Sequence, residues 1–471
     1  MLFRSTRVAS DVGIVKLWNP TDGYGSLGSG GVLASGADGR IFWDGPETTI
    51  TFDTPVNTGN LATERLGFAG TGKTYVLTGL VSGTGWLRAS SGAVLDLRQQ
   101  TAVTNTNLGG VEVGNATVIA ANDGNLGGGA VNFTGTSSLL VVKASGTLAR
   151  SMTVGVTSGS GVTASIDTEA NTVTLSGSFT NTVGTTGGGL VKLGSGRLTI
   201  AGQAVYTGPT RVTAGVLTLT SGSLAGGVDG TGSLVKTGSQ TLVLAGAGTL
   251  SGPTTVQGGK VVLANASALS SSTLAVVAGG TAQVAPYLVT GVGGLNLSGT
   301  GLVDLTNGGL TVAAGLSPTQ LVAQLVAGRN GGTWDGTSGI TSSVTAAQVA
   351  NSELRAVGWL DNGDGSLTTA YAAQGDTNLD WVVDILDVAN FVGSGKYGTP
   401  DAATWSEGDF NYDGVVDIQD VADFAATGLY GGPSYNSASG IAAVPEPSGV
   451  AVVAMASTAI RRLRQPHALG R

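Results

Sequence analysis

Two segments near the C-terminal end carry the residue types best suited to chemistry. Each twelve-residue segment places side-chain oxygens at positions 1, 3, 5, 9 and 12, and the second segment begins 33 residues after the first. Calcium takes six to eight oxygen ligands, and alternate positions of a wound loop converge on one point. The pattern therefore predicts two calcium sites, each completed by the backbone carbonyl of position 7. The predicted ligands are Asp376, Asn378, Asp380, Val382, Asp384 and Asp387 in the first loop, and Asp409, Asn411, Asp413, Val415, Asp417 and Asp420 in the second.

The two loops differ at position 6, where the chain must turn sharply. Gly414 suits this turn in the second loop, whereas the first loop has Trp381. A bulky residue at positive φ costs on the order of 1–2 kcal/mol, so we expect the first site to bind calcium more weakly. Each loop runs into an expected amphipathic helix, over 385–391 and 418–426.

This duplicated loop-helix pair resembles the type I dockerin domain over residues 375–430, with Asp387 and Asp420 at the twelfth position. The resemblance implies a small α-helical, calcium-binding domain that tethers a secreted protein to a cohesin-like partner. The spacing leaves open whether the domain binds such a partner or serves only as a calcium-clipped fold.

Composition excludes several kinds of active site. The 471 residues include no Cys, and the only histidine is His467. Disulfides, thiolate metal sites, a Ser-His-Asp triad and a His-based metal site in the folded body are therefore excluded. Of 30 acidic residues, 13 lie between 361 and 423. Such an acidic segment repels itself without a cation and argues against nucleic acid as a partner.

An internal repeat indicates the architecture of the preceding region. Residues 188–219 and 232–263 align without a gap, so that Leu190–Lys192 matches Leu234–Lys236 and Gly208–Thr210 matches Gly252–Thr254. Short apolar strands between Gly-rich turns gain a core only by stacking on their neighbours. We predict a mainly β fold: a right-handed parallel β-helix (solenoid) over 41–316, with two coils per 44-residue unit and about a dozen coils. A β-sandwich is the structural alternative.

The two units resemble the autotransporter-associated β-strand repeat, most clearly over 188–263. The resemblance implies an extracellular rod of a structural or adhesive kind.

The C-terminal tail, 444–464, combines a Pro-Glu-Pro motif, an apolar stretch over 449–460 and the basic residues Arg461, Arg462 and Arg464. This order resembles the PEP-CTERM sorting signal, which implies a sorting protease as a partner. Residues 1–40 form a lead segment without a signal-peptide pattern, which we interpret as a mis-set start. The expected location is extracellular or at the outer cell surface.

Three further segments complete the predicted organisation. A connecting module spans 317–374 and begins with a helix from Pro318 to about Ala327, which Gly328 ends. A flexible linker spans 431–443. Gly67–Thr74 fits a phosphate-loop motif, but a strand-like segment follows where such a loop needs a helix, so we interpret it as a solenoid turn.

Three functions remain open. The first is a structural or adhesive surface protein without an active site. The second is a β-helix polysaccharide lyase or glycoside hydrolase with a dockerin, although the solenoid acids Asp123, Asp167, Glu169, Asp229 and Asp304 are scattered. The third is a scaffold that binds surface polysaccharide, with Trp18, Trp43, Trp86, Trp334 and Trp359 stacking on sugars or simply packing.

Overall fold

The computed structural model describes residues 15–19, 23–24, 39–43, 48–52, 56–58, 61–63, 65–98, 104–155 and 161–437. The predicted sorting tail, most of the lead segment and the side chains of Trp18 and Trp43 lie outside the described part. The chain divides into two compact units. The first comprises residues 1–347 and 361–370, and the second comprises 348–360 and 371–471.

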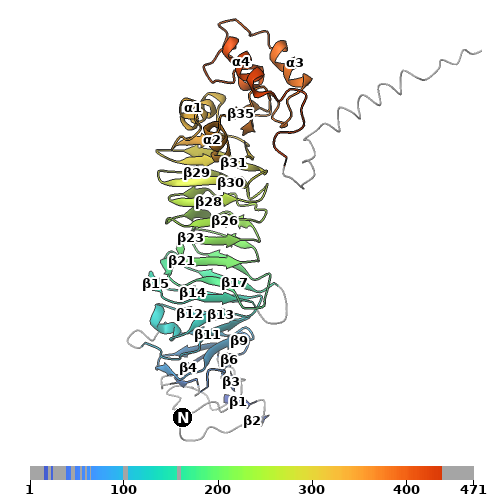
Figure 1. The fold of residues 1–471 in the computed structure, drawn as a ribbon. Helices are drawn as coiled ribbons and strands as arrows, with labels where there is room; N and C mark the ends of the chain where they lie inside the picture. The colour runs from blue at the N-terminus through green and yellow to red at the C-terminus, as the bar shows by residue number, and fades with distance from the viewer. Residues whose placement is uncertain are drawn as a thin grey trace, which may run out of the picture. The chain divides into compact units, whose positions relative to one another are not determined.

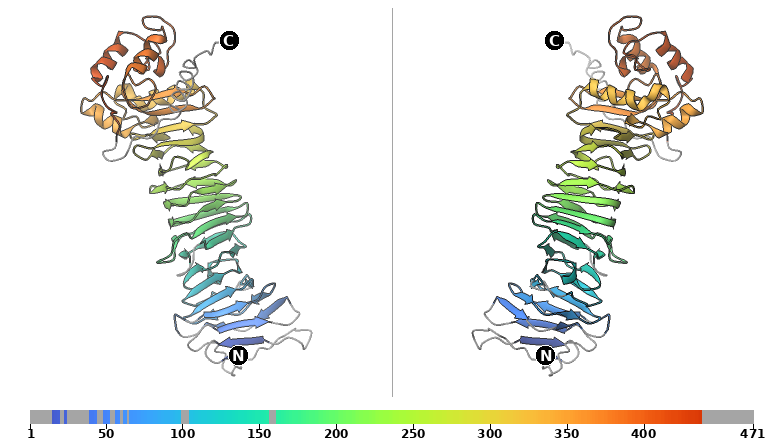
Figure 2. Two further views of the ribbon diagram at one scale, coloured as in Figure 1. Left: turned by 90° about the vertical axis from the view of Figure 1, so that its right-hand side faces the viewer. Right: turned by 90° about the vertical axis from the view of Figure 1, so that its left-hand side faces the viewer.

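Parallel ladders of short strands form the first unit (Figures 1 and 2). One ladder runs through β15 (Gly146–Leu148), β18 (Thr172–Leu175), β21 (Arg197–Tyr206), β23 (Val216–Leu224), β25 (Ser233–Lys236), β27 (Thr254–Val256), β29 (Leu269–Val276) and β31 (Val289–Leu297). A second runs through β3 (Gly39–Trp43), β6 (Arg65–Ala69), β9 (Trp86–Ser90), β11 (Gly110–Gly114), β13 (Ala130–Phe133), β16 (Met152–Val154) and β19 (Phe179–Asn181). It continues through the later parts of β21 and β23 to β26 (Thr241–Leu244), β28 (Gly259–Leu263), β30 (Gly280–Val284), β32 (Leu302–Asp304) and β34 (Gly339–Thr341).

A third ladder runs through β4 (Thr49–Phe52), β7 (Thr74–Leu77), β10 (Val94–Asp96), β12 (Thr117–Ala120), β14 (Ser138–Val142), β17 (Thr163–Asp167), β20 (Gly189–Leu193), β22 (Thr210–Val212) and β24 (Val228–Gly230). The remaining strands of this unit are β1 (Val15–Asn19), β2 (Gly23–Tyr24), β5 (Val56–Asn57), β8 (Val81–Ser82), β33 (Gly309–Val312) and β36 (Leu367–Ala372), which belongs to this unit up to Ala370. The ladders confirm a parallel β-solenoid of about 12 turns. They exclude the β-sandwich for the described strands, because every step of the three ladders is parallel, and the antiparallel pairings β1–β2, β1–β3 and β33–β36 are not steps of these ladders.

The two sequence repeats occupy different faces of the solenoid. Leu190 lies on β20 of the third ladder, whereas its counterpart Leu234 lies on β25 of the first. Leu198 pairs with Leu217, and Leu217 pairs with Leu234, so two coils take only 36 residues here. The prediction of two coils per 44-residue unit is therefore wrong. The repeated element is therefore a strand-turn-strand step whose two copies lie on different faces.

Lys192, in the first repeat, is fully buried without a carboxylate in hydrogen-bonding contact. Its ammonium instead donates to three backbone carbonyl oxygens, those of Leu193 (2.6 Å), Gly194 (2.8 Å) and Ala214 (3.4 Å). Burial lowers the pKa of this lysine to about 8, and the charge of Asp167 opposes the shift. The lysine thus connects a turn of its own coil to the next coil.

Lys236 repeats this arrangement at the matching position of the second repeat. It is also fully buried, and its ammonium donates to the carbonyls of Thr237 (2.7 Å), Gly238 (2.9 Å) and Gly258 (3.0 Å). Burial lowers its pKa as well. The residue that the two repeats share at this position therefore serves as an internal clasp between coils.

Helices cover the C-terminal end of the solenoid (Figure 1). They are α1 (Pro318–Arg329), the short 3₁₀ helix η2 (Asn330–Gly332) and α2 (Ser343–Ala350), which belongs to the first unit up to Ala347. A further 3₁₀ helix, η1 (Asp123–Leu126), lies between β12 and β13. The helix α1 begins at Pro318 as predicted, with Ser317 as its cap, but it continues past Gly328 to a left-handed Asn330. Gly328 is needed for packing, because a Cβ there would lie 1.8 Å from the carbonyl oxygen of Ile340.

The phosphate-loop motif is a turn between strands. β6 ends at Ala69 and β7 begins at Thr74, and the hydroxyl of buried Tyr75 donates to the carbonyl of Ala69 (2.6 Å). No helix follows the turn, which agrees with its interpretation as a solenoid turn.

Replacing Lys236 by Met keeps the buried volume but removes the clasp. We expect Lys236→Met to lower the free energy of unfolding of the solenoid by about 2–4 kcal/mol, because three buried carbonyls lose their donor. Urea unfolding followed by circular dichroism measures the change. Lys260→Met is the matched control, because Lys260 is only partly buried and its ammonium contacts the side chain of Gln283 at 3.2 Å. Equal stability of both variants would contradict the clasp.

Candidate functional site

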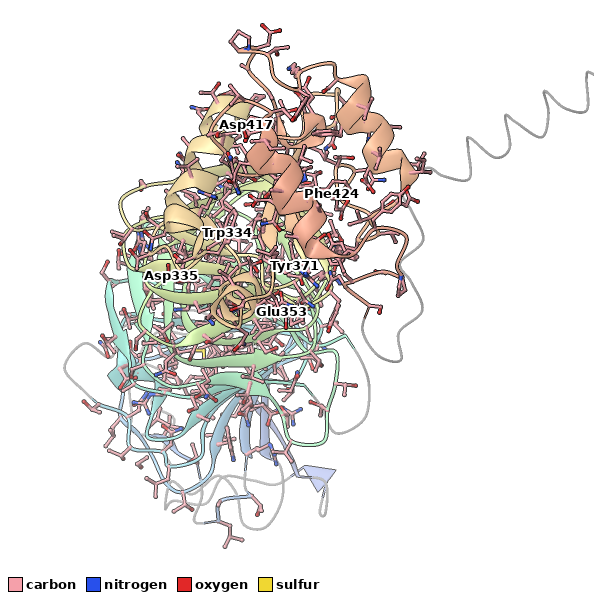
Figure 3. The ribbon with its side chains drawn as sticks, turned by 45° about the horizontal axis from the view of Figure 1, so that its top comes forward. Trp334, Asp335, Glu353, Tyr371, Asp417 and Phe424 are labelled. Carbon is pink, nitrogen blue, oxygen red and sulfur yellow. The ribbon has the colours of Figure 1, made fainter. Side chains whose placement is uncertain are left out.

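The predicted calcium loops lie in the second unit, where each leads directly into a helix. The elements are β35 (Ala356–Asp361), which belongs to this unit up to Leu360, α3 (Ile385–Gly393), the 3₁₀ helix η3 (Trp405–Glu407) and α4 (Ile418–Thr427). The ninth residue of each loop, Asp384 or Asp417, is the N-cap of its helix and accepts a backbone N–H of the first turn. Figure 3 shows Asp417 at the start of α4. The helices thus begin where the sequence pattern predicts.

The two loops make the same hydrogen bonds, position by position. The carboxylate of position 1 accepts the N–H of position 6, at 3.0 Å in both loops. Oxygens at positions 3 and 5 accept the N–H groups two residues later: Asn378 from Asp380 (3.1 Å), Asp380 from Val382 (2.9 Å), Asn411 from Asp413 (2.8 Å) and Asp413 from Val415 (3.0 Å). These bonds wind both segments in the same way.

The twelfth residue of each loop is buried and holds the loop closed. The carboxylate of Asp387 accepts the N–H groups of Thr377 and Asp384, both at 2.8 Å. The carboxylate of Asp420 accepts those of Phe410 and Asp417, both at 2.9 Å.

One oxygen in each loop is buried and has no partner. These are Oδ1 of Asp376 and Oδ1 of Asp409, the same atom of position 1 in both loops. The side chains are almost completely enclosed, with Asp376 at 0% and Asp409 at 5% exposure. The carbonyl oxygens of Val382 and Val415 likewise accept no backbone hydrogen bond from the described residues. A buried carboxylate oxygen without a donor costs free energy unless a cation or proton satisfies it.

The pKa values of these carboxyls reflect the same burial. Burial raises the pKa of Asp376 to about 8, against a hydrogen bond from Tyr435, and the charges of Asp387 and Asp380 raise it further. Burial raises the pKa of Asp409 to about 6, with the charge of Asp420 adding to the effect. Burial also raises the pKa of Asp387 and of Asp420.

The ligand atoms that the loops offer fit calcium, although the acidic side chains of each loop do not lie close together. Within the described residues, no three His, Cys, Asp or Glu side chains form a cluster that could hold a metal ion. Backbone N–H groups hold the carboxylates in place instead. The fit rests on the unpartnered Oδ1 atoms and on oxygen-only donors, which are the ligands that calcium prefers.

Trp381 does occupy a left-handed conformation, with φ of 65°, and Gly414 takes the same turn at 90°. The fourth positions, Leu379 and Tyr412, are also left-handed, at 58° and 62°. The Trp381 indole N–H donates to the carbonyl of Tyr371 (3.0 Å), which holds the strained turn in place. The expected difference between the two loops therefore has a structural basis, and the ligand assignments stay predictions.

The duplication extends beyond the loops, and each half packs against the other. Val383 pairs with Tyr430, and Val416 pairs with Tyr397, so the eighth position of each loop pairs with the segment after the other helix. A Cβ on Gly375, just before the first loop, would lie 2.2 Å from the ring of Phe424. A Cβ on Gly408, before the second loop, would lie 2.3 Å from Phe391. Extending the 33-residue offset along the sequence would have found these pairs.

Two supporting residues were missed by the sequence analysis. Tyr435, in the predicted linker, donates its hydroxyl to Oδ2 of Asp376 and accepts the N–H of Ala373. Trp405 is fully buried, and its indole N–H donates to the carbonyl of Asp376 (2.6 Å). No sequence motif marks either residue.

The solenoid acids that could have formed an active site are engaged elsewhere. Asp123 pairs with Arg150 (2.8 Å), Glu169 with Lys143, and Asp229 lies 3.6 Å from Arg211. Asp167 accepts the N–H of Glu169 (2.7 Å), and Asp304 accepts the N–H of Thr306 (2.9 Å).

Two of the tryptophans considered for sugar stacking are packing residues. Trp334 and Trp359 are only 2% and 4% exposed, so neither presents a ring face to a ligand.

Comparison with known proteins bears on the repeats. A family model described as "Passenger-associated-transport-repeat" matches residues 190–219 and 234–263. These are the two sequence repeats, and they comprise β20 to β23 and β25 to β28. No curated protein and no solved structure matches the chain.

The matched repeats and the solenoid fit a structural β-helix protein that is secreted or displayed at a surface. Among the described helices, none has the length and apolar character needed to cross a membrane.

The raised pKa values of Asp376 and Asp409 predict that, without calcium, the second unit is more stable at acidic pH than at neutral pH. In the folded unit, the pKa values of Asp376 and Asp409 are about 8 and about 6, above the ordinary value of 3.8. Both carboxyls therefore bind protons more tightly in the folded state than in the unfolded state. The folded state therefore loses stability as the pH rises from about 4 to about 8. Calorimetry in a chelator should show the transition of the second unit at a lower temperature at pH 8 than at pH 5.

Asp376→Asn should reduce this dependence, because an amide does not titrate, while Asp401→Asn, on an exposed turn of the same unit, should preserve it. A transition temperature that rises with pH in the chelator would contradict the burial of the charged carboxylates.

Proposed function

We propose that this chain is an exported, non-enzymatic structural or adhesive solenoid whose C-terminal unit binds two calcium ions and tethers it to a partner. The observation that carries this proposal is the pair of buried, unpartnered Oδ1 atoms at the first position of two loops with matching hydrogen bonds. The two equivalent loops leave the same carboxylate oxygen buried and without a partner, and the binding of one kind of ion in both loops explains this better than chance.

The first calcium ion would be held by Asp376, Asn378, Asp380, the carbonyl of Val382, Asp384 and Asp387. The second would be held by Asp409, Asn411, Asp413, the carbonyl of Val415, Asp417 and Asp420. Calcium would neutralise the acidic loops and join each loop to the start of its helix, so binding would be coupled to folding of the unit. The resemblance of this unit to dockerins supports the assignment.

Exposed apolar residues at the helix starts support a tethering role. Ile385 and Ile418, at equivalent positions, are 63% and 68% exposed, and Leu386 beside them is 58% exposed. Large apolar side chains held in solvent on a rigid helix favour contact with another protein. A cohesin-like protein is the partner that the dockerin resemblance implies, and the predicted tail would direct export through a sorting protease.

A polysaccharide scaffold is the second candidate function. The repeats support it only as far as a surface location. Trp334 and Trp359 are buried and present no stacking face, whereas Trp86 on β9 is half-buried.

Calcium titration of the full chain tests the proposal. We expect two binding events at neutral pH, with the first loop about five- to thirtyfold weaker because of the strained Trp381. Asp409→Ala should remove the tighter event and Asp376→Ala the weaker one, whereas Asp401→Ala, outside both loops, should leave both unchanged. Isothermal titration calorimetry after chelator treatment provides the readout. No calcium heat at millimolar concentration would overturn the calcium assignment.

A further inference from the structure

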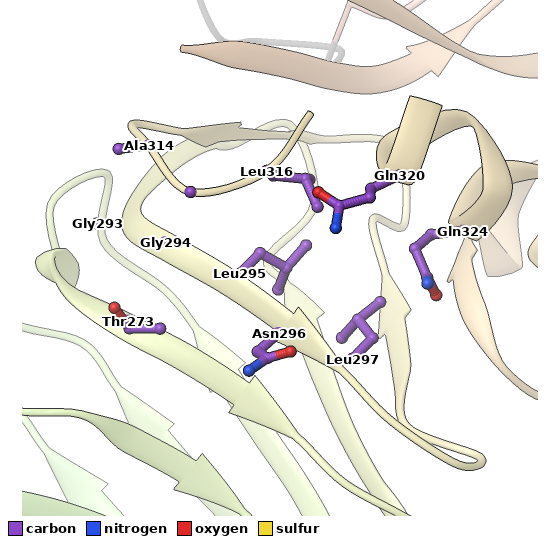
Figure 4. A pocket seen from close by; sticks show the side chains of 11 residues that line it. Thr273, Gly293, Gly294, Leu295, Asn296, Leu297, Ala314, Leu316, Gln320 and Gln324 are labelled. Atoms are coloured by element: carbon purple, nitrogen blue, oxygen red, sulfur yellow. The ribbon is translucent and has the colours of Figure 1, made fainter. Parts of the chain in front are cut away.

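The first ladder ends at β31, and a slot opens beside this last strand (Figure 4). Residues Gly294–Leu297 of β31 pair with β29, and no other described strand pairs with them on the opposite side. The chain leaves this face at Ala314–Leu316 and enters α1. The resulting cavity has a volume of about 380 Å³. It lies where the next strand of the ladder would run.

The edge of β31 directs backbone groups into this slot. In a parallel ladder, alternate residues turn both N–H and C=O toward the same neighbour. The N–H of Ser298 donates to the carbonyl of Val276 on β29 (3.1 Å), so Asn296 and Gly294 also face β29. The N–H and C=O groups of Leu295 and Leu297 therefore face the slot. Leu295 is only 6% exposed, and buried backbone groups of this kind require a partner.

The side chains around the slot are uncharged, and they combine apolar groups of Leu295, Leu297 and Leu316 with polar ones. The hydroxyl of Thr273 and the amides of Asn296 and Gln324 line it and make no hydrogen bond within the described residues. No lining residue is ionisable. Gly293, Gly294 and Gly315 leave part of the wall without side chains, so a main chain can approach the edge closely.

We propose that this slot binds an extended, uncharged segment of a partner polypeptide, which pairs with β31 as the next strand of the ladder. Strand addition supplies hydrogen-bonding partners to Leu295 and Leu297, as it does wherever a peptide adds to an open sheet edge. The absence of charge in the lining selects a neutral segment. A strand residue fills roughly 160 Å³ from its rise, strand spacing and sheet thickness, so the cavity holds about two or three residues.

Fluorescence anisotropy with the full chain tests this proposal. The probe is a fluorescein-labelled peptide with the sequence of residues 271–279, because this strand already pairs with β31 on its other side. We expect saturable binding. A second peptide with proline at the positions of Ala275 and Val277 should not bind, because in a parallel ladder these residues turn their N–H groups toward the preceding strand, as the N–H of Val277 does toward the carbonyl of Val256 (3.0 Å).

Two protein variants distinguish the slot from other surfaces. Ala314→Trp places an indole in the slot and should weaken peptide binding at least tenfold. Thr255→Trp, on the same face but two coils away, should leave binding unchanged. Hydrogen exchange should show the amides of Leu295 and Leu297 becoming protected when the peptide binds.

Three results would overturn the proposal: no binding of the peptide at millimolar concentration, binding that Ala314→Trp does not weaken, or equal binding of the proline peptide. If no peptide bound, and Ala314→Trp instead weakened the binding of a neutral oligosaccharide, the slot would be assigned to a sugar. Because the slot lies wholly in the solenoid unit, these results are independent of the calcium titration.

Discussion

The fold of the solenoid depends on main-chain hydrogen bonding between successive coils. Its strands are short, and their side chains are mostly Leu, Val, Thr and Gly, so no single coil can bury enough surface to be stable. Each coil gains a core only when the next coil continues its columns, as Leu198, Leu217 and Leu234 do. The buried clasps of Lys192 and Lys236 reinforce the same contacts by satisfying carbonyls at the corners. Where this pairing ends, at β31, the structure leaves an edge that can still accept a strand.

The buried charged groups of the two units differ in whether the chain itself supplies their bonding partners, and this difference supports the proposed roles of the units. In the solenoid, the buried ammonium groups of Lys192 and Lys236 each have three carbonyl partners within the chain. In the second unit, Asp376 and Asp409 each keep a buried oxygen without a partner. A structural rod needs no ligand, whereas a calcium-dependent tether must leave part of its bonding to the ion. The chain therefore combines a rod whose two buried lysines are satisfied internally with a unit that we propose responds to calcium.

The sequence predicted the parallel solenoid, the helix starts at Ile385 and Ile418, and the left-handed turn at Trp381, because each has a local physical cause. The coil count per repeat could not be predicted, since it depends on how many residues each corner consumes. Lys192 and Lys236 were visible as a shared residue, but their burial depends on carbonyls supplied by the next coil. Tyr435 and Trp405 reach Asp376 only through tertiary packing, and the open edge of β31 depends on where α1 leaves the ladder. The calcium ligands, the partner and the sorting tail stay predictions.

Anomalous diffraction from crystals of the full chain grown with calcium tests the central claim most directly. The account predicts two calcium peaks, one about 2.3–2.6 Å from Oδ1 of Asp376 and one at the same distance from Oδ1 of Asp409. The peak at the first loop should be weaker at limiting calcium. Ordered loops without peaks, with both Oδ1 atoms bonded to protein or water, would contradict the account and leave the solenoid as a rod without a calcium-dependent tether.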